Sequence, residues 1–367
     1  MIDLIIKSLE SSDSLATFLK NYYTSAINVD PKEVVVCFGL NENTIKLLEY
    51  YPINFIVDDS QAGTIVSKTP VISKEQVPKG CLIINCSFSI YPRTVSVISN
   101  TLQPKKVIPF MQVAAFSDND LLPDFVKSTY DCWRNRLEKL KLLYNRFEDE
   151  ESRLQFLNVI IYRLTGDNCR DFGFSVDFDI QYFEDFIRPY AKGVFVDGGG
   201  YTGDTAQGYL NFFSGEFSAL HVFEPDKGNC IVAENKFSSY ENIYIYPVGL
   251  SNKNEKLKFC NLNTTFSSFS DEGNVEISVT KIDDSIDGKI DYIKLDVEGF
   301  DFKAIQGAKR HIIKDTPCMA IAVYHDSNHF WQIPDFVLSL NSSYRLRFRH
   351  YSEGWSESII YFLPNKS

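Results

Sequence analysis

The sequence lacks the features that would place it in a membrane or on a nucleic acid. No apolar run approaches the roughly 18–20 residues that span a bilayer. The apolar start at Met1–Leu9 is short and lacks a small-residue cleavage site, so we expect no signal peptide. The net charge is −11 and no basic stripe is evident, which argues against a nucleic-acid partner.

The sequence also lacks any CxxC pair among its eight cysteines. That spacing offers no ordinary zinc site. Most of the cysteines lie in apolar runs, which indicates buried, reduced thiols and a cytoplasmic protein. The composition (44% hydrophobic, 23% charged) is typical of a soluble globular protein and is compatible with a small-molecule or carbohydrate partner.

The length of 367 residues favours two domains and a connector over one core. We expect a Rossmann-like α/β domain over 1–118, a helical connector over 119–170, and a larger α/β domain over 171–367. The connector is predicted from apolar residues that recur at three- and four-residue spacing.

In the first domain, apolar runs alternate with helical stretches, which predicts a parallel sheet. The runs lie at 34–39, 53–59, 82–85 and 106–110. Gly39 closes the first run and Asp58 and Asp59 close the second, as in half of a nucleotide site. A docking or dimerising domain without a ligand is the alternative, and a homo-oligomer is left open.

In the last domain, seven strands are predicted, ending in a hairpin-like pair, with a β-like insertion between the third and the fourth. The strands lie at 194–197, 219–223, 243–246, 291–295, 318–324, 344–349 and 357–362, and the insertion includes 256–260 and 275–279.

The most informative stretch is Val194–Thr205, VFVDGGGYTGDT, a buried strand that ends in a glycine turn. Glycine permits positive φ and lets a ligand approach the backbone. About twenty residues later a second strand ends at Glu224, which is how an α/β domain holds an adenosine ribose. A tight connection without a ligand is the alternative.

The details of the turn select the cofactor. A dinucleotide site needs free N–H groups for a pyrophosphate at the start of a helix, but here the glycines directly follow Asp197, and Asp204 lies where a phosphate would approach. No Gly-Lys-Ser/Thr follows, and the two carboxylates would repel a diphosphate. The same carboxylates suit the ammonium group of S-adenosylmethionine (SAM), which has no phosphate. We therefore expect SAM as the cofactor.

A further motif, DYIKLDVEGFDFKAIQGA at 291–308, strongly resembles the FkbM-type methyltransferases. Weaker matches are Val279–Asp284, Tyr324-His325 with Ile333-Pro334, Arg349–Glu353, and Gln181–Phe183. The resemblance covers roughly residues 150–365. It departs from the family pattern at Phe300-Asp301 and at Gly199.

The resemblance implies a seven-stranded, Rossmann-like class I methyltransferase domain that transfers a methyl group from SAM to a hydroxyl. Many members carry an additional N-terminal Rossmann-like domain. The residues expected to bind the cofactor are Asp197, Gly198, Gly199, Gly200, Tyr201, Gly203, Asp204, Thr205, Glu224, Pro225, Asp226, Gly249, Leu250, Ser251 and Asp296.

The catalytic candidates lie at the ends of later strands. Lys294, Asp296 and Glu298 share one face if the fourth strand continues to Glu298. They form a catalytic cluster, a metal site, or an ion pair in which Lys294 neutralises a carboxylate. His325 is the preferred general base, as a neutral imidazole, and His350 is the alternative. Asp296, Glu298 and His325 are also the candidate ligands of Mg or Mn.

The leading hypothesis is a SAM-dependent O-methyltransferase that acts on a sugar or glycan precursor in surface polysaccharide biosynthesis. A catalytically silent SAM-binding scaffold that partners glycosyltransferases is the alternative. A nicotinamide-dependent oxidoreductase is disfavoured, because no G-x-G-x-x-G follows Val36.

Overall fold

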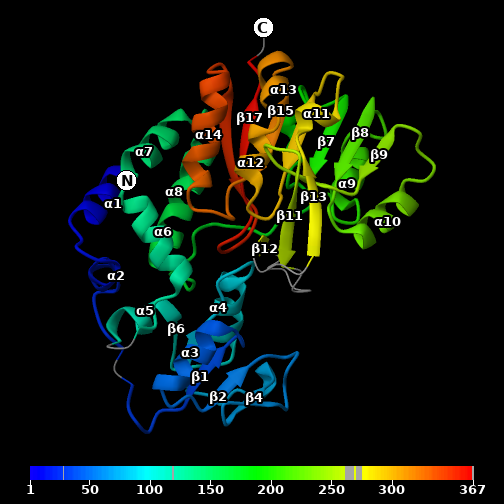
Figure 1. Cartoon of the computed structure of the whole chain (residues 1–367). Coiled ribbons are helices and arrows are strands. Elements are labelled where there is room, and N and C mark those ends of the chain that lie inside the picture. Colours follow the sequence, from blue (N-terminus) through cyan, green and yellow to red (C-terminus); the bar gives the residue numbers. More distant parts are fainter. Residues whose placement is uncertain (28, 118–119, 261–267, 270–274, 366–367) are drawn as a thin grey trace. The chain divides into compact units, whose positions relative to one another are not determined.

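The computed structural model describes residues 1–27, 29–117, 120–260, 268–269 and 275–365 (Figure 1). The chain forms two compact units that interleave along the sequence. Unit 1 consists of Met1–Lys141, Leu154–Val176 and His350–Ser356, and unit 2 consists of Leu142–Arg153, Asp177–Arg349 and Glu357–Ser367. The three-part division expected from the sequence stays a prediction.

Unit 1 contains a six-stranded sheet in the order β3-β4-β2-β1-β5-β6. Its strands are β1 (Val35–Phe38), β2 (Phe55–Val57), β3 (Ile65–Val66), β4 (Thr69–Ile72), β5 (Leu82–Asn85) and β6 (Lys106–Pro109). Strands β1, β2, β4, β5 and β6 pair in parallel. The alternating pattern predicts β1, β2, β5 and β6, whereas β4 was not predicted. The short antiparallel strand β3 was not expected, because two residues give no readable alternation.

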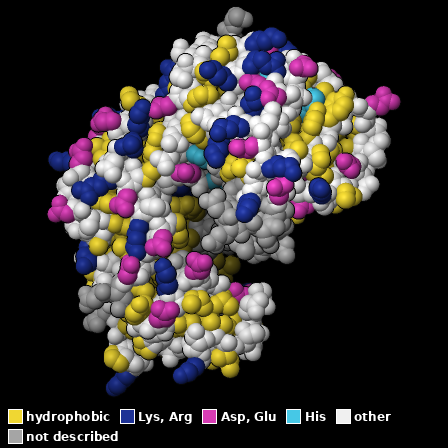
Figure 2. Space-filling model, viewed as in Figure 1, with side chains coloured by type: hydrophobic (Ala, Val, Ile, Leu, Met, Phe, Trp, Pro, Cys, Tyr) yellow, Lys and Arg dark blue, Asp and Glu magenta, His cyan; other side chains and the backbone are white. Residues whose placement is uncertain are grey.

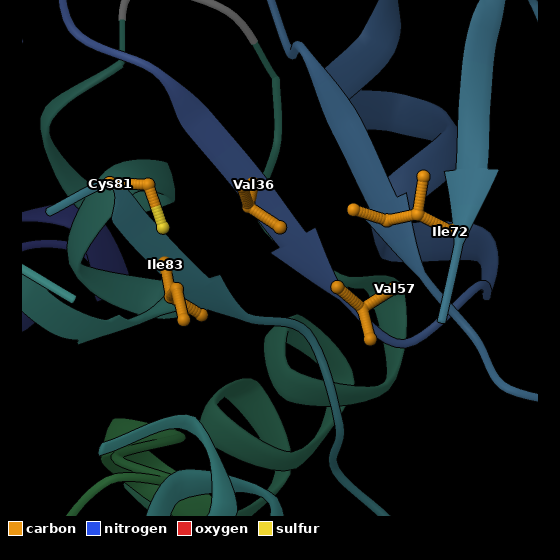
Figure 3. Close-up of a cluster of buried hydrophobic side chains, with 5 residues drawn as sticks. All are labelled: Val36, Val57, Ile72, Cys81 and Ile83. Atoms are coloured by element: carbon orange, nitrogen blue, oxygen red, sulfur yellow. The ribbon is translucent and has the colours of Figure 1, made fainter. Parts of the chain in front are cut away.

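A compact apolar cluster holds this sheet together. It consists of Val36, Val57, Ile72, Cys81 and Ile83, which are all buried and come from neighbouring strands or their ends (Figure 3). Cys81 packs here as a small apolar side chain. The helices of unit 1 are α1 (Ile2–Glu10), α2 (Leu15–Tyr23), α3 (Glu42–Tyr50), α4 (Pro92–Thr101), α5 (Phe110–Phe116) and α6 (Asp124–Arg134), with the 3-10 turn η1 (Lys74–Gln76). The residues of α7 (Leu137–Arg146) and α8 (Glu150–Thr165) are divided between the units.

Unit 2 contains the seven-stranded sheet, in the order β16-β17-β15-β14-β7-β8-β9. Its strands are β7 (Val194–Gly198), β8 (Ala219–Phe223), β9 (Ile243–Tyr246), β14 (Tyr292–Leu295), β15 (Cys318–Ala322), β16 (Arg345–His350) and β17 (Ser358–Leu363). β17 runs antiparallel to β15, whereas β9, β8, β7, β14 and β15 pair in parallel. The expected Rossmann-like α/β class is confirmed.

The predicted insertion forms a separate four-stranded sheet in the order β10-β13-β11-β12. Its strands are β10 (Gly249–Leu250), β11 (Glu255–Cys260), β12 (Ser268–Phe269) and β13 (Val275–Thr280). Residues 261–267 and 270–274 of the insertion lie outside the described residues. The remaining elements of unit 2 are η2 (Asp185–Ile187), α9 (Asp204–Phe212), α10 (Lys227–Lys236), α11 (Ile282–Ser285), α12 (Asp301–Gln306), α13 (Lys309–Lys314) and α14 (His329–Leu340).

The centre of the large sheet rests on a stack of aromatic rings. Phe195 of β7 packs against both Tyr209 of α9 and Tyr292 of β14, with ring centroids 4.5 and 5.0 Å away, and the two tyrosine rings lie 6.4 Å from each other. The three side chains are fully buried. β7 also marks the point where the chain order reverses, because β8 continues to one side and β14 lies on the other. Ligands of open α/β sheets bind outside the carboxyl ends of the strands at such a point.

The described residues include no helix that is both long and apolar enough to cross a membrane. On the face drawn in Figure 2, the side chains of Lys and Arg are interspersed with those of Asp and Glu.

Candidate active site

A cavity of about 1960 Å³ lies within unit 2, with the ends of β7, β8 and β14 in its wall. Single-ligand pockets are roughly 300–1,000 Å³, so the cavity has room for a cofactor and a second molecule. The sequence-predicted residues that line it are Gly199, Tyr201, Asp204, Thr205, Glu224, Pro225, Asp226, Gly249, Leu250, Lys294, Asp296 and Glu298. The predicted residues outside its lining are Asp197, Gly198, Gly200, Gly203, Ser251, His325 and His350.

The turn is built from glycines chiefly because neighbouring protein atoms leave no room for Cβ atoms. A Cβ atom on Gly199, which has a φ of +75°, would lie 1.9 Å from the backbone oxygen of Asp296. A Cβ atom on Gly200 would lie 2.1 Å from the Val222 side chain. The sequence pattern pointed to close approach by a ligand, and the structure shows that close approach of neighbouring strands already requires glycine here. Gly199 nevertheless lines the cavity.

Behind the turn, Asp197 and Lys294 form a buried ion pair. The Lys294 Nζ lies 3.0 Å from Asp197 Oδ1, and the two side chains are 3% and 0% exposed. Nζ also donates to the backbone oxygens of Gly198, at 3.2 Å, and Gly199, at 2.7 Å. Burial raises the pKa of Asp197 to about 6, against the opposing effect of Lys294. The sequence leaves three roles open for Lys294: part of a catalytic cluster, part of a metal site, and an ion pair with a carboxylate. Its contacts match the ion pair, which connects β14 to the glycine turn.

The carboxylate of Glu224 is fixed by backbone N–H groups at the end of β8. Its Oε2 accepts from Tyr201 N–H and its Oε1 accepts from Asp226 N–H, each at 2.9 Å. Burial raises the pKa of Glu224, and these hydrogen bonds oppose the increase. Each oxygen retains a further lone pair. The carboxylate is therefore held in place at the cavity wall by backbone N–H groups and can accept hydrogen bonds from the two hydroxyls of a ribose.

The fourth strand of the large sheet is shorter than the catalytic prediction assumed. β14 ends at Leu295, and Glu298 has a left-handed backbone with a φ of +50°. The expectation that Lys294, Asp296 and Glu298 alternate along one strand is therefore wrong. Asp296 and Glu298 reach the cavity from a turn instead.

Asp301 organises that turn and was missed by the sequence reasoning. Its carboxylate accepts from Val297 N–H at 3.0 Å and from Gly299 N–H at 3.2 Å. It also lies 2.9 Å from Nδ1 of His325. An acidic residue in the first turn of a helix that follows a glycine was the available signal, because acids stabilise helix N-termini.

His325 lies among carboxylates, directly behind the cavity wall. Its Nε2 is 3.4 Å from Asp296 Oδ1 and 3.4 Å from Glu298 Oε2. Burial alone lowers the pKa of His325, but the Asp301 carboxylate and its neighbours raise it well above the ordinary value. The environment therefore favours the imidazolium form in the free protein, contrary to the neutral imidazole that we expected.

The group of possible metal ligands in the structure differs from the predicted group by one residue. Among the described residues, one group brings three suitable atoms within 4.8 Å of one another, and it consists of Asp296, Asp301 and His325. Asp301 thus stands where Glu298 was expected. Because both Asp301 oxygens already accept N–H groups, this donor set fits an orienting role better than ligation of a divalent ion.

The alternative base, His350, belongs to unit 1. Its ring packs against Phe174 with centroids 4.4 Å apart, and burial lowers its pKa to about 3. It is therefore a neutral, packed side chain, and we do not retain it as a base.

The loop that precedes β7 supplies cavity residues whose roles the sequence did not reveal. The Tyr182 hydroxyl donates to Asp296 Oδ2 at 2.7 Å, and Gln181 Nε2 donates to Glu357 Oε2 at 2.7 Å. Burial, followed by the effect of Asp296, raises the pKa of Glu357 to about 7. The resemblance had marked Gln181–Phe183, but only folding shows what these side chains contact.

The sheet order, the cavity at the switch point and the fixed Glu224 together define a Rossmann-like domain of the class that binds nucleoside-containing cofactors. Residues 197–350 match the family model of the methyltransferase FkbM domain. This segment of the chain is therefore an FkbM methyltransferase domain.

A solved FkbM structure shares this fold over most of the chain. The methyltransferase FkbM from Methylobacillus flagellatus KT superposes with a TM-score of 0.70 at 21% identity, covering 90% of this chain and 89% of its own. An rRNA methylase from Streptococcus thermophilus gives a TM-score of 0.35 at 12% identity, over 52% of this chain and 99% of its own. Aeropyrum pernix fibrillarin with bound S-adenosyl-L-methionine gives 0.31 at 11% identity, over 47% and 67%. No curated protein matches the chain.

Proposed function

We propose that this protein is a cytoplasmic, SAM-dependent O-methyltransferase that methylates a hydroxyl of a sugar or glycan precursor in surface polysaccharide biosynthesis. The observation that carries the proposal is one cavity with two kinds of lining. One part of the lining contains the Glu224 carboxylate, held by backbone N–H groups, and Gly199 of the glycine turn. Another part contains Asp296 and Glu298, and His325 lies directly behind these two carboxylates.

The first lining suits the cofactor, whose sulfonium supplies an activated methyl group when bound. Glu224 accepts from the ribose hydroxyls, and the turn beside the buried Asp197–Lys294 pair receives the amino-acid portion. Pro225 and Leu250 offer apolar surface for the adenine. Asp204 adds negative charge that favours an ammonium group over a phosphate.

The second lining suits the acceptor. Methyl transfer from a sulfonium needs an oriented hydroxyl and removal of its proton. Asp296 and Glu298 orient the hydroxyl, and the neutral form of His325, with Nε2 unprotonated, accepts the hydroxyl proton at that nitrogen, which faces both carboxylates. Asp301 holds the other ring nitrogen and is a positioning residue.

Calorimetric titration of SAM into the Glu224→Gln variant tests the cofactor end of the cavity. We expect the Kd to rise at least about tenfold, because an amide offers one acceptor oxygen instead of two. Glu234→Gln, on the exposed side of α10, is the matched control and should bind like the wild type. Unchanged binding by Glu224→Gln would remove the proposed pocket.

Transfer of a labelled methyl group from SAM to a panel of sugars, with and without Mg, tests the reaction. Activity without Mg is expected, because the grouped side chains fit orientation better than metal ligation. SAM binding without any methyl transfer would instead support the alternative that the protein is a non-catalytic, SAM-binding scaffold that partners glycosyltransferases.

A further inference from the structure

The side of the cavity near β14 and β17 differs from the proposed cofactor side in its residues, which are mainly acidic and aromatic. We call it the acceptor wall and define it as Phe178, Asp179, Tyr182, Glu298, Phe300 and Glu357, all of which line the cavity. These residues come from the loop before β7, the turn after β14 and the residue before β17. The proposed cofactor residues lie instead at the ends of β7 and β8 and on β10.

The six side chains of the acceptor wall include three carboxyl groups and no Lys, Arg or His. The neighbouring positive groups are each held by carboxylates: His325 Nε2 lies 3.4 Å from Glu298 Oε2, and Lys294, whose Nζ lies 5.2 Å from the centre of the Tyr182 ring, is paired with Asp197. Asp179, Glu298 and Glu357 contribute carboxyl groups, and Asp296 lies beside them in the lining. Burial, followed by the effect of Asp296, raises the pKa of Glu357 to about 7, so that carboxyl is partly neutral near neutral pH. A phosphate bound at this wall would have to approach the carboxyl groups of Asp179, Asp296 and Glu298.

The lysines that line the rest of the cavity do not compensate for this. Lys294 is paired with Asp197 at 3.0 Å, and Lys256 is paired with Glu276 at 2.7 Å. Lys227 begins α10, next to the cofactor residue Asp226. No arginine occurs in the cavity lining that the structure describes. Phosphate recognition normally relies on Arg forks, Lys or a helix N-terminus. The described wall has no Arg or Lys, and at the start of α12, whose N-cap is Phe300, the Asp301 carboxylate already accepts from the N–H groups of Val297 and Gly299.

The wall also contains aromatic residues. Phe178 is 44% exposed although it is a large apolar residue, and Phe300 also faces the cavity. The negative face of an aromatic ring attracts the weakly positive C–H groups of a pyranose, and carboxylates accept from its hydroxyls. A wall of rings and acceptors is therefore complementary to an uncharged, polyhydroxylated ring.

The backbone of the wall is unusually constrained. Tyr182, Glu298 and Glu357 have left-handed φ angles of +72°, +50° and +67°. Non-glycine residues held in this region cost free energy and persist where the surroundings fix them. The backbone N–H of Tyr182, for example, donates to the Tyr361 hydroxyl at 3.1 Å. The three side chains are thus presented from fixed positions.

From the charge and surface of this wall, we propose that the acceptor is an uncharged sugar unit of a glycoside or glycan, and not a sugar phosphate or a nucleotide sugar. This inference rests on the proposed function and adds the substrate class. Methylation would accordingly precede the attachment of phosphate or follow its removal by glycosyl transfer.

The test uses the full chain, labelled SAM and matched sets of methyl glycosides, sugar 1-phosphates and UDP-sugars of glucose, galactose and mannose. We expect at least one methyl glycoside to be methylated with a kcat/KM at least tenfold above its phosphorylated counterparts. The preference should be largest at low ionic strength, because salt screens repulsion by the wall. In Glu298→Gln the ratio of neutral to phosphorylated kcat/KM should narrow severalfold, whereas Glu234→Gln should leave it unchanged.

Faster methylation of a phosphate or a UDP-sugar than of its glycoside would overturn this inference and leave the proposed function standing. No turnover of any sugar by protein that binds SAM normally would overturn both.

Discussion

At the scale of single residues, the proposed mechanism assigns the hydrogen bond between Asp301 and His325 a role in setting the pH at which His325 can accept a proton. Because only the neutral imidazole accepts a proton, its raised pKa implies that kcat/KM rises with pH through a value above the ordinary 6.5. Below that pH the ring is protonated and activity falls.

The Asp301→Asn variant tests this arrangement. Removing the carboxylate lowers the pKa of His325, so the acid limb of the pH profile should move to lower pH. Loss of ring orientation should also reduce kcat by about 10–100-fold. Asp335→Asn, exposed on α14, is the control and should keep the wild-type profile. A reduced kcat with an unmoved acid limb would show that Asp301 does not act through His325.

At the scale of elements, the approach of β7 to the turn after β14 depends on Gly199. In Gly199→Ala the new methyl group would meet the Asp296 backbone oxygen and would strain a left-handed residue. We expect a loss of at least about 2 kcal/mol in the free energy of unfolding. Gly288→Ala, where a Cβ meets nothing within 4 Å, should stay within about 0.5 kcal/mol of the wild type. Denaturant unfolding measures both, and equal stabilities would refute the proposed crowding.

The same elements show how far the sequence could be read. Strands β8 and β9 begin and end where their apolar runs do, and Glu224 follows β8 as expected. The end of β14 could not be read, because Leu295–Gly299 continues a strand-like pattern while Asp301 draws the backbone N–H groups of Val297 and Gly299 into a turn. That contact is made by a side chain from the next helix, and periodicity does not report it.

Contacts in the cavity wall between residues far apart in the sequence could not be predicted either. Gln181 and Glu357 are 176 positions apart in the sequence and still share a hydrogen bond. The resemblance marked Gln181 but gave no partner for it, and Glu357 looked like an ordinary residue at the start of a strand. Pairings over such separations are set by the topology of the whole sheet.

At the scale of the whole molecule, each of the two units has its own sheet, and the cavity lies in unit 2 alone. We therefore expect scanning calorimetry of the full chain to show two transitions. S-adenosylhomocysteine at about 100 times its Kd should stabilise the transition of unit 2 by about 2.7 kcal/mol. The other transition should not move. One transition that shifts as a whole would show instead that the units unfold cooperatively.

The left-handed backbone at Tyr182, Glu298 and Glu357 has a consequence for how new substrate preferences can arise. β-Branched and bulky residues rarely adopt that conformation, so these three sites tolerate few exchanges. Phe178 and Phe300 are not held in it. Directed evolution toward other acceptors should therefore begin at these two phenylalanines, where the shape of the cavity can change without disturbing the chain that frames it.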